Sequence, residues 1–233
     1  MHGNTRRRRA RRWGLALPGV VIASALLLAA CGDTGGDAAT EASTQAPSSH
    51  APSSHAPSTV AESGLAYEPP VAAQPFTLTG MDGEAVSLAD FRGQVVAIYF
   101  GYTHCPDMCP LTLGTYKAAL SRLPEGRDED VQVLMLTVDP ARDTPEVLGR
   151  YMALFRDDFI GLTGSQADVD AVLASWGIEV LRTEPNEFGA YEVEHPVDSW
   201  VLDRDGRLRL KVSHMTGIDA LVADLQSLLE EGN

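Results

Sequence analysis

The sequence predicts an α/β fold in which a mixed sheet is flanked by helices. Two continuous apolar runs of strand length, residues 95–100 and 131–138, indicate strands that are covered on both faces. Segments with helical periodicity follow each run, so these two strands are expected to be parallel. A later pair of short apolar runs surrounds a turn at residues 203–206, which indicates an antiparallel edge.

The elements follow one another with ordinary start and stop signals. A small hairpin over residues 76–88 precedes the first core strand as an N-terminal extension. A helix is expected over residues 111–123, with Pro110 at its first position. Thr144 is a suitable N-cap for a second helix that runs to residue 155. Two more helices are expected over residues 166–176 and 217–229, and the last of these is amphipathic.

The 233 residues divide into three parts by composition. Residues 1–30 combine an arginine-rich start with an uncharged apolar stretch, which is typical of an export signal. Residues 31–64 are rich in Ala, Ser, Thr, Pro and Gly and repeat the pentapeptide APSSH, which indicates a flexible tether. Residues 65–233 carry the periodic segments and are expected to form one globular domain.

The apolar stretch ends in Leu-Ala-Ala followed by Cys31, which resembles the lipobox of bacterial lipoproteins. In that class Cys31 would be lipidated and would become the first residue of the mature protein. Two alternatives are open: a transmembrane anchor, since 18 apolar residues can just span a bilayer, and a plain cleaved signal. The lipoprotein interpretation places the domain on the extracytoplasmic face of a bacterial cell membrane, held by a lipid anchor.

The charge balance excludes one class of partner. Six of the 18 basic residues lie in the first twelve positions, so the rest of the chain carries 12 basic against 32 acidic residues, a net charge of −20. Such a surface repels phosphate backbones, and nucleic-acid binding is therefore not expected.

A cysteine pair follows the first core strand directly. Residues 99–110 read YFGYTHCPDMCP, so Cys105 and Cys109 are four residues apart and a helical turn would bring their sulfurs to one side. The N-terminus of the helix near Pro110 is expected to favour thiolate at Cys109. Two sulfurs suit copper(I) better than zinc, which usually takes four ligands. An inert disulfide is the alternative, although so short a loop gains little from closure.

A third ligand has to come from elsewhere in the chain. His104 is adjacent to Cys105, but neighbouring side chains in an extended loop often point apart. His195 precedes the late strand at Trp200. If that strand lies beside the cysteine-bearing strand, the loop before it would face the cysteines. A structural or solvated histidine remains the alternative at this point.

Four segments together resemble the Sco/SenC family of membrane-anchored copper proteins. They are YFGYTHCPDMCP at residues 99–110, VDPARDTP at 138–145, FIGLTG at 159–164 and YEVEHPVDSWVLD at 191–203. The resemblance covers nearly all of residues 70–230. The last segment departs from the family by placing Glu194 before the histidine and Pro196 after it.

The resemblance implies a thioredoxin-like fold and a copper ion bound by Cys105, Cys109 and His195. It also implies delivery of copper to the copper A subunit of cytochrome c oxidase, or to another copper acceptor. Asp139 matches an acidic position of the family. It either orients a ligand from the second coordination shell or caps the turn at Pro140.

Two enzymatic functions compete with the copper chaperone. A thiol–disulfide oxidoreductase would use Cys105 or Cys109 as its nucleophile, although three residues separate them instead of the usual two and Asp107 is expected to oppose thiolate formation. Such an enzyme would reduce cysteines of the oxidase subunit or of other exported proteins. A peroxidase would need an arginine near the thiolate, for which Arg142 is the candidate.

Overall fold

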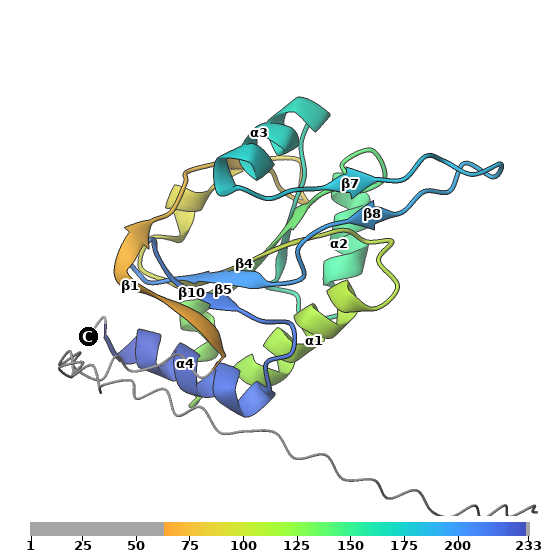
Figure 1. The fold of residues 1–233 in the computed structure, drawn as a ribbon. Coiled ribbons are helices and arrows are strands. Elements are labelled where there is room, and N and C mark those ends of the chain that lie inside the picture. The colour runs from red at the N-terminus through yellow and green to blue at the C-terminus, as the bar shows by residue number, and fades with distance from the viewer. Residues whose placement is uncertain (1–62, 232–233) are drawn as a thin grey trace, which may run out of the picture. The chain divides into compact units, whose positions relative to one another are not determined.

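A six-stranded mixed sheet forms the centre of the protein in the computed structural model, which describes residues 63–231 (Figure 1). The strand order is β1-β10-β9-β4-β5-β6. The strands of this sheet are β1 (Gly64–Ala72), β4 (Val95–Gly101), β5 (Val131–Thr137), β6 (Ile160–Leu162), β9 (Ser199–Leu202) and β10 (Arg207–Val212). Two small hairpins accompany it, formed by β2 (Thr77–Thr79) with β3 (Ala85–Ser87) and by β7 (Leu181–Arg182) with β8 (Val193–Glu194).

The two predicted core strands lie at the middle of the sheet. β4 and β5 are parallel, and all seven residues of β4 are buried. The other edges of this pair are occupied by β6, which is parallel to β5, and by β9, which is antiparallel to β4. Burial on both faces explains why the two runs are continuously apolar, as expected for strands covered by helices.

Four α-helices cover the sheet: α1 (Met108–Leu120), α2 (Pro145–Met152), α3 (Gln166–Trp176) and α4 (Ile218–Glu230). Figure 1 shows α1, α2 and α4 on one side of the sheet and α3 on the other. Neighbouring residues of β4 mark the two sides. Tyr99 faces α1 and bonds to Cys109, whereas the ring of Phe100 packs against Trp176 of α3 with 5.7 Å between centroids. The predicted arrangement with helices on both faces is confirmed.

The helix ends mostly follow the local signals. Thr144 accepts a hydrogen bond from the N–H of Val147, and Ser165 accepts one from Asp168. α1 begins at Met108, three residues before the expected start, so Pro110 is its third residue and not its first. Proline is tolerated in the first turn because the N–H it lacks would have had no partner within the helix. Short 3-10 turns, Leu88–Phe91 and Asp128–Asp130, precede β4 and β5.

Strand β1 has no clear signal in the sequence. It pairs antiparallel with β10 at the edge of the sheet and contains Glu68, Pro69 and Pro70. Its register shifts between Ala66 and Val71, and all of its residues are exposed or half-buried. Prolines are compatible with an edge strand, where a backbone N–H is not needed on the outer side. The pairing with β10 therefore decides the conformation of this segment.

The predicted signal segment, Cys31 and the tether up to residue 62 lie outside the described residues. In the part of the chain that the structure does describe, none of the helices combines the length and the apolar character needed to cross a bilayer.

Two glycines give a matched test of the packing between β6 and α2. A Cβ at Gly161 would lie 2.9 Å from Cβ of Leu148 in α2, whereas one at Gly114 in α1 would meet nothing within 4 Å. Gly161→Ala is expected to lower the free energy of unfolding by about 1–3 kcal/mol, because the helix has to move away from the strand. Gly114→Ala is expected to raise it by up to about 1 kcal/mol, because alanine favours a helix. Urea unfolding measures both, and equal effects would contradict this packing.

Candidate metal centre

The two cysteines lie where the central strand β4 turns into helix α1. Cys105 is half-buried in the loop after the strand, and Cys109 is the second residue of the helix and fully buried. The N–H of Cys109 donates to the sulfur of Cys105 over 3.4 Å. Both cysteines are free thiols. The four-residue spacing therefore brings the sulfurs together, as predicted.

The sulfur of Cys109 sits in a pocket left open by a glycine. The hydroxyl of Tyr99 donates a hydrogen bond to this sulfur over 3.4 Å. A Cβ at Gly101 would lie 3.0 Å from the same sulfur and 2.6 Å from the Tyr99 ring. Any side chain at position 101 would therefore push on both groups, and only glycine leaves them room.

His195 reaches the cysteines through the topology of the sheet. β9 is antiparallel to β4, with Ser199 paired to Tyr99, so the loop before β9 lies at the end of β4 where the cysteines are. The Nε2 atom of His195 is 3.8 Å from the sulfur of Cys109. One ligand atom from each of Cys105, Cys109 and His195 lies within 4.8 Å of the others. The structure thus brings together the three residues named from the sequence.

The imidazole of His195 is held in one orientation. Its Nδ1 donates to the carbonyl of Pro196 over 2.9 Å, because a carbonyl can only accept. The lone pair of the neutral ring is therefore on Nε2, the atom that faces the sulfur. Tyr99 and Tyr102 both meet the ring edge to face, with centroids 6.1 and 5.5 Å away. The main-chain carbonyl of Pro196, one of the two departures from the family pattern, thus supplies the acceptor for the ring nitrogen.

Asp139 holds the segment before His195 and does not itself reach the cysteines by any described hydrogen bond. It is buried, pairs with the guanidinium of Arg142 and accepts from the Tyr191 hydroxyl over 2.7 Å. Arg142 also donates to the Tyr191 carbonyl over 3.1 Å and stacks on the Tyr191 ring, 3.7 Å from its centroid. Tyr191 is four residues before His195, so the cluster of Asp139, Arg142 and Tyr191 fixes the position of the segment that carries His195.

A second buried aspartate orders the cysteine loop. Asp143 accepts from the N–H and the hydroxyl of Thr103, over 3.0 and 2.6 Å, and from the hydroxyl of Thr137 over 2.7 Å. These bonds join the loop before Cys105 to the end of β5. Neither the spacing of the motif nor its composition singles out Asp143, because its partners come from two other elements of the fold.

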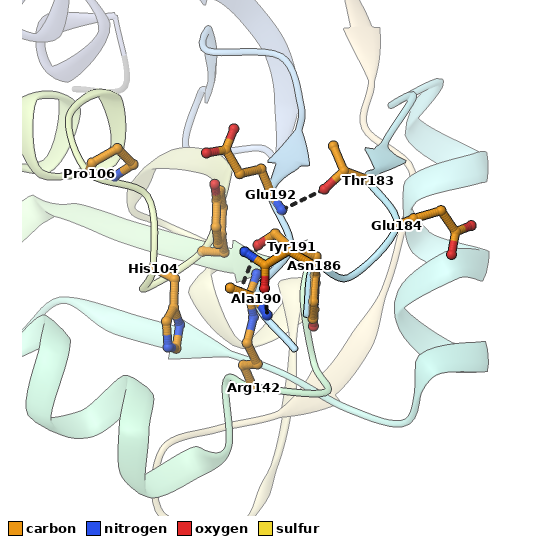
Figure 2. Close-up of a pocket in the computed structure, with 10 residues that line it drawn as sticks. His104, Pro106, Arg142, Thr183, Glu184, Asn186, Ala190, Tyr191 and Glu192 are labelled. Atoms are coloured by element: carbon orange, nitrogen blue, oxygen red, sulfur yellow. Dashed lines mark hydrogen bonds between the residues drawn. The ribbon is translucent and has the colours of Figure 1, made fainter. Parts of the chain in front are cut away.

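A cavity of about 520 Å³ adjoins the site (Figure 2). His104 and Pro106 lie on one side of it, and the β7–β8 hairpin with Tyr191 lies on the other, as Figure 2 shows. His104 is half-exposed and contacts Thr103, with 3.1 Å between Nδ1 and Oγ1. It belongs to the rim of the cavity and not to the group of three ligands. Arg142 also lines the cavity, where its Nε pairs with Asp139 and its Nη1 donates to the Tyr191 carbonyl; the described hydrogen bonds join it to neither cysteine, and the peroxidase hypothesis stays untested.

The two cysteines differ in acidity. The pKa of the Cys105 thiol is lowered to about 5, mainly by a hydrogen bond from Cys109 and further by the N–H groups of Asp107, Met108 and Cys109. The pKa of the Cys109 thiol is raised, because ionisation would remove the bond it makes to Cys105 and because the group is buried. The expectation that Cys109 would be the thiolate is therefore wrong. Because α1 begins at Met108, the free N–H groups of its first turn face Cys105.

The chemistry of this group is that of a soft metal site. Two sulfurs and one imidazole nitrogen converge, with no carboxylate among them. Thiolate and imidazole ligands select copper(I) over hard cations such as magnesium. Zinc in a closed structural site usually takes a fourth protein ligand.

Comparison with known proteins agrees with this geometry. The model of the family described as SCO1/SenC matches residues 66–230. This chain belongs to the SCO1/SenC family. The fold is thioredoxin-like, as in the solved structures of Sco proteins.

Two solved Sco structures illustrate the likeness. ScoI of Bradyrhizobium japonicum, determined with copper bound, is 31% identical with a TM-score of 0.63, and the match covers 68% of this chain and 99% of that chain. Apo Sco1 of Thermus thermophilus is 38% identical with a TM-score of 0.65, and the match covers 71% and 95% of the two chains.

Curated relatives include mitochondrial proteins. The human protein SCO1 homolog is 33% identical over 138 residues, which are 59% of this chain and 46% of that protein. The human protein SCO2 homolog is 38% identical over 132 residues, 56% of this chain and 50% of that protein. The match thus spans about half of the length of these mitochondrial relatives.

The acidity of Cys105 gives a direct prediction for the reduced, metal-free protein. Thiolate is the form that reacts with iodoacetamide, so alkylation of Cys105 is expected to reach half of its plateau rate near pH 5 and to fall below that pH. In Cys109→Ala the midpoint is expected to move up toward the ordinary range of about 8.5, because the main hydrogen bond is lost. Mass spectrometry of the alkylated peptide measures both, and a midpoint near 8.5 in the unaltered protein would contradict the assignment.

Proposed function

We propose that this protein is a copper metallochaperone that binds copper(I) through Cys105, Cys109 and His195 and delivers it for assembly of the copper A centre of cytochrome c oxidase. The observation that carries the proposal is the convergence of these three ligand atoms within 4.8 Å of one another. Two of the ligands are 86 residues apart in sequence and meet only through the fold.

The placement of the ligands suits transfer as well as binding. Cys109 is buried, whereas Cys105 and His195 are only partly buried. Copper(I) tolerates two or three soft ligands, so an incoming thiolate of an acceptor can bond to the metal before one of the three ligands leaves. Cys105, the more accessible sulfur, is the ligand that exchanges first, and Cys109 is the last to release the metal.

The relatives support both the cargo and the acceptor. ScoI proteins of Bradyrhizobium japonicum and Arabidopsis thaliana and Sco1 of yeast have been solved with copper bound. BsSco, which is similar in fold, is a member of the Sco family of cytochrome c oxidase assembly proteins. For this chain, the copper A subunit or another copper-accepting protein is the proposed partner.

We also propose that the domain works on the extracytoplasmic face of the membrane, tethered by a lipid on Cys31. A lipoprotein of this family is known from Bacillus anthracis, with 26% identity to this chain. Membrane fractionation tests the anchor: Cys31→Ser is expected to release the protein into the soluble fraction. Retention of that variant in the membrane would favour an uncleaved apolar anchor.

Copper(I) titration against a competing chelator tests the three-ligand site. Cys105→Ala, Cys109→Ala and His195→Ala each remove a proposed ligand. Each is expected to weaken binding by more than the roughly 10- to 100-fold that is typical when a residue supporting a metal ligand is mutated. His104→Ala is the matched control, because this histidine adjoins Cys105 but lies outside the group, and it is expected to keep the original affinity. Unaltered binding in His195→Ala would disprove the assignment of the third ligand.

A thiol–disulfide oxidoreductase is the second candidate, favoured by the unequal acidity of the cysteines. Cys105 is the accessible thiolate that could attack a substrate disulfide, and buried Cys109 is placed to resolve the mixed disulfide. The backbone N–H of Asp107 stabilises the Cys105 sulfur, whereas opposition by its carboxylate stays a prediction. Reduction of a model disulfide without copper, with full activity in His195→Ala, would favour this function over the chaperone.

A further inference from the structure

The buried hydroxyl of Tyr99 is a polar group of the site that neither proposed function has used. Tyr99 is fully buried in β4, and its hydroxyl lies 3.4 Å from the sulfur of Cys109, which is also fully buried. A buried phenol hydroxyl needs a hydrogen-bond partner, since burying it without one is costly. A phenol keeps its proton at neutral pH, so the hydroxyl donates and the sulfur accepts.

The contact between the hydroxyl and the sulfur is enforced from several sides. Gly101 leaves just enough room, because a Cβ there would collide with both the Tyr99 ring and the Cys109 sulfur. The Tyr99 ring also meets the His195 imidazole edge to face, 6.1 Å between centroids. One phenol thus touches one of the proposed sulfur ligands and borders the proposed nitrogen ligand.

We propose that Tyr99 is a positioning residue of the dithiol site, which keeps the Cys109 sulfur directed at Cys105 and His195 and stabilises it as a free sulfur relative to a disulfide. The part of the proposal that concerns copper rests on the proposed function, whereas the part that concerns the disulfide does not. A hydrogen bond withdraws electron density from the accepting sulfur, and a disulfide sulfur is a weaker acceptor than a thiol or thiolate. The bond therefore favours the reduced pair.

The redox step that reports this effect is exchange with a small dithiol such as dithiothreitol. The Cys105–Cys109 bond breaks as the reagent's two thiols are oxidised to its cyclic disulfide, and their two electrons and two protons pass to the protein cysteines. The equilibrium constant of this exchange compares the reduced and oxidised pairs in the metal-free protein.

Two buried tyrosines make a matched comparison. Tyr116 of α1 is also almost fully buried, but its hydroxyl bonds to Ser199 over 2.7 Å and not to a cysteine. Tyr99→Phe is expected to shift the exchange about tenfold toward the disulfide, which makes the reduction potential about 30 mV more negative. Tyr116→Phe removes a buried hydroxyl as well and is expected to leave the equilibrium unchanged.

A second readout follows the sulfur itself. In the copper(II)-loaded protein, the sulfur-to-copper charge-transfer band of Tyr99→Phe is expected at lower energy. The hydrogen bond lowers the energy of the sulfur lone-pair electrons, so its loss makes their transfer to copper easier. The band of Tyr116→Phe is expected at the original position. If copper(I) does not bind in the titration, the proposed function fails, but a tenfold shift in the metal-free equilibrium would still support the role of Tyr99.

The role of Tyr99 is overturned if Tyr99→Phe folds and neither the equilibrium nor the band moves, or if Tyr116→Phe moves the equilibrium by the same amount. A measurement on the unaltered protein decides the matter if Tyr99→Phe does not fold. The ¹³Cζ resonance of labelled Tyr99 is expected to shift between the dithiol and the disulfide, whereas that of Tyr116 is not. An unchanged Tyr99 resonance would then overturn the proposal.

Discussion

The antiparallel pairing of β9 with β4 is the contact on which the site depends. β4 carries the cysteine loop at its end, and β9 begins at that same end because the two strands run in opposite directions. The loop before β9 therefore delivers His195 to the cysteines without any long connection. A parallel β9 would place His195 at the opposite end of the sheet, and no metal site could form from these residues.

The packing around this pairing divides the roles of the two sulfurs. Helix α1 starts early enough that the N–H groups of its first turn serve Cys105, while Cys109 is enclosed by the core and by Tyr99. One sulfur is thus an accessible thiolate, and the other is a buried thiol. This asymmetry suits both stepwise release of a soft metal and disulfide exchange, so the two chemistries share one physical basis.

The β7–β8 hairpin is also held in place by contacts close to the metal site. Figure 1 shows it projecting beyond the strands, and the cluster of Asp139, Arg142 and Tyr191 connects it to the body of the domain. Asp139 thus acts at a distance from the sulfurs, through the segment that leads to His195. This contact is compatible with ligand orientation, one of the two roles that the sequence left open for this residue, and that role stays a prediction.

The core strands, the helices and the cysteine pair could be predicted from the sequence, because these depend on local periodicity and on spacing within one turn. Residues 95–100 and 131–138 are apolar throughout, and a spacing of four can be interpreted without knowledge of the fold. The approach of His195, the acidity of each cysteine and the conformation of β1 were decided by the tertiary structure. The first and the last depend on a partner far along the chain, β4 for His195 and β10 for the edge strand, whereas the acidity of the cysteines depends on where α1 starts and on how deeply the core buries Cys109. Such pairings follow from the burial of whole elements against one another, which no local pattern records.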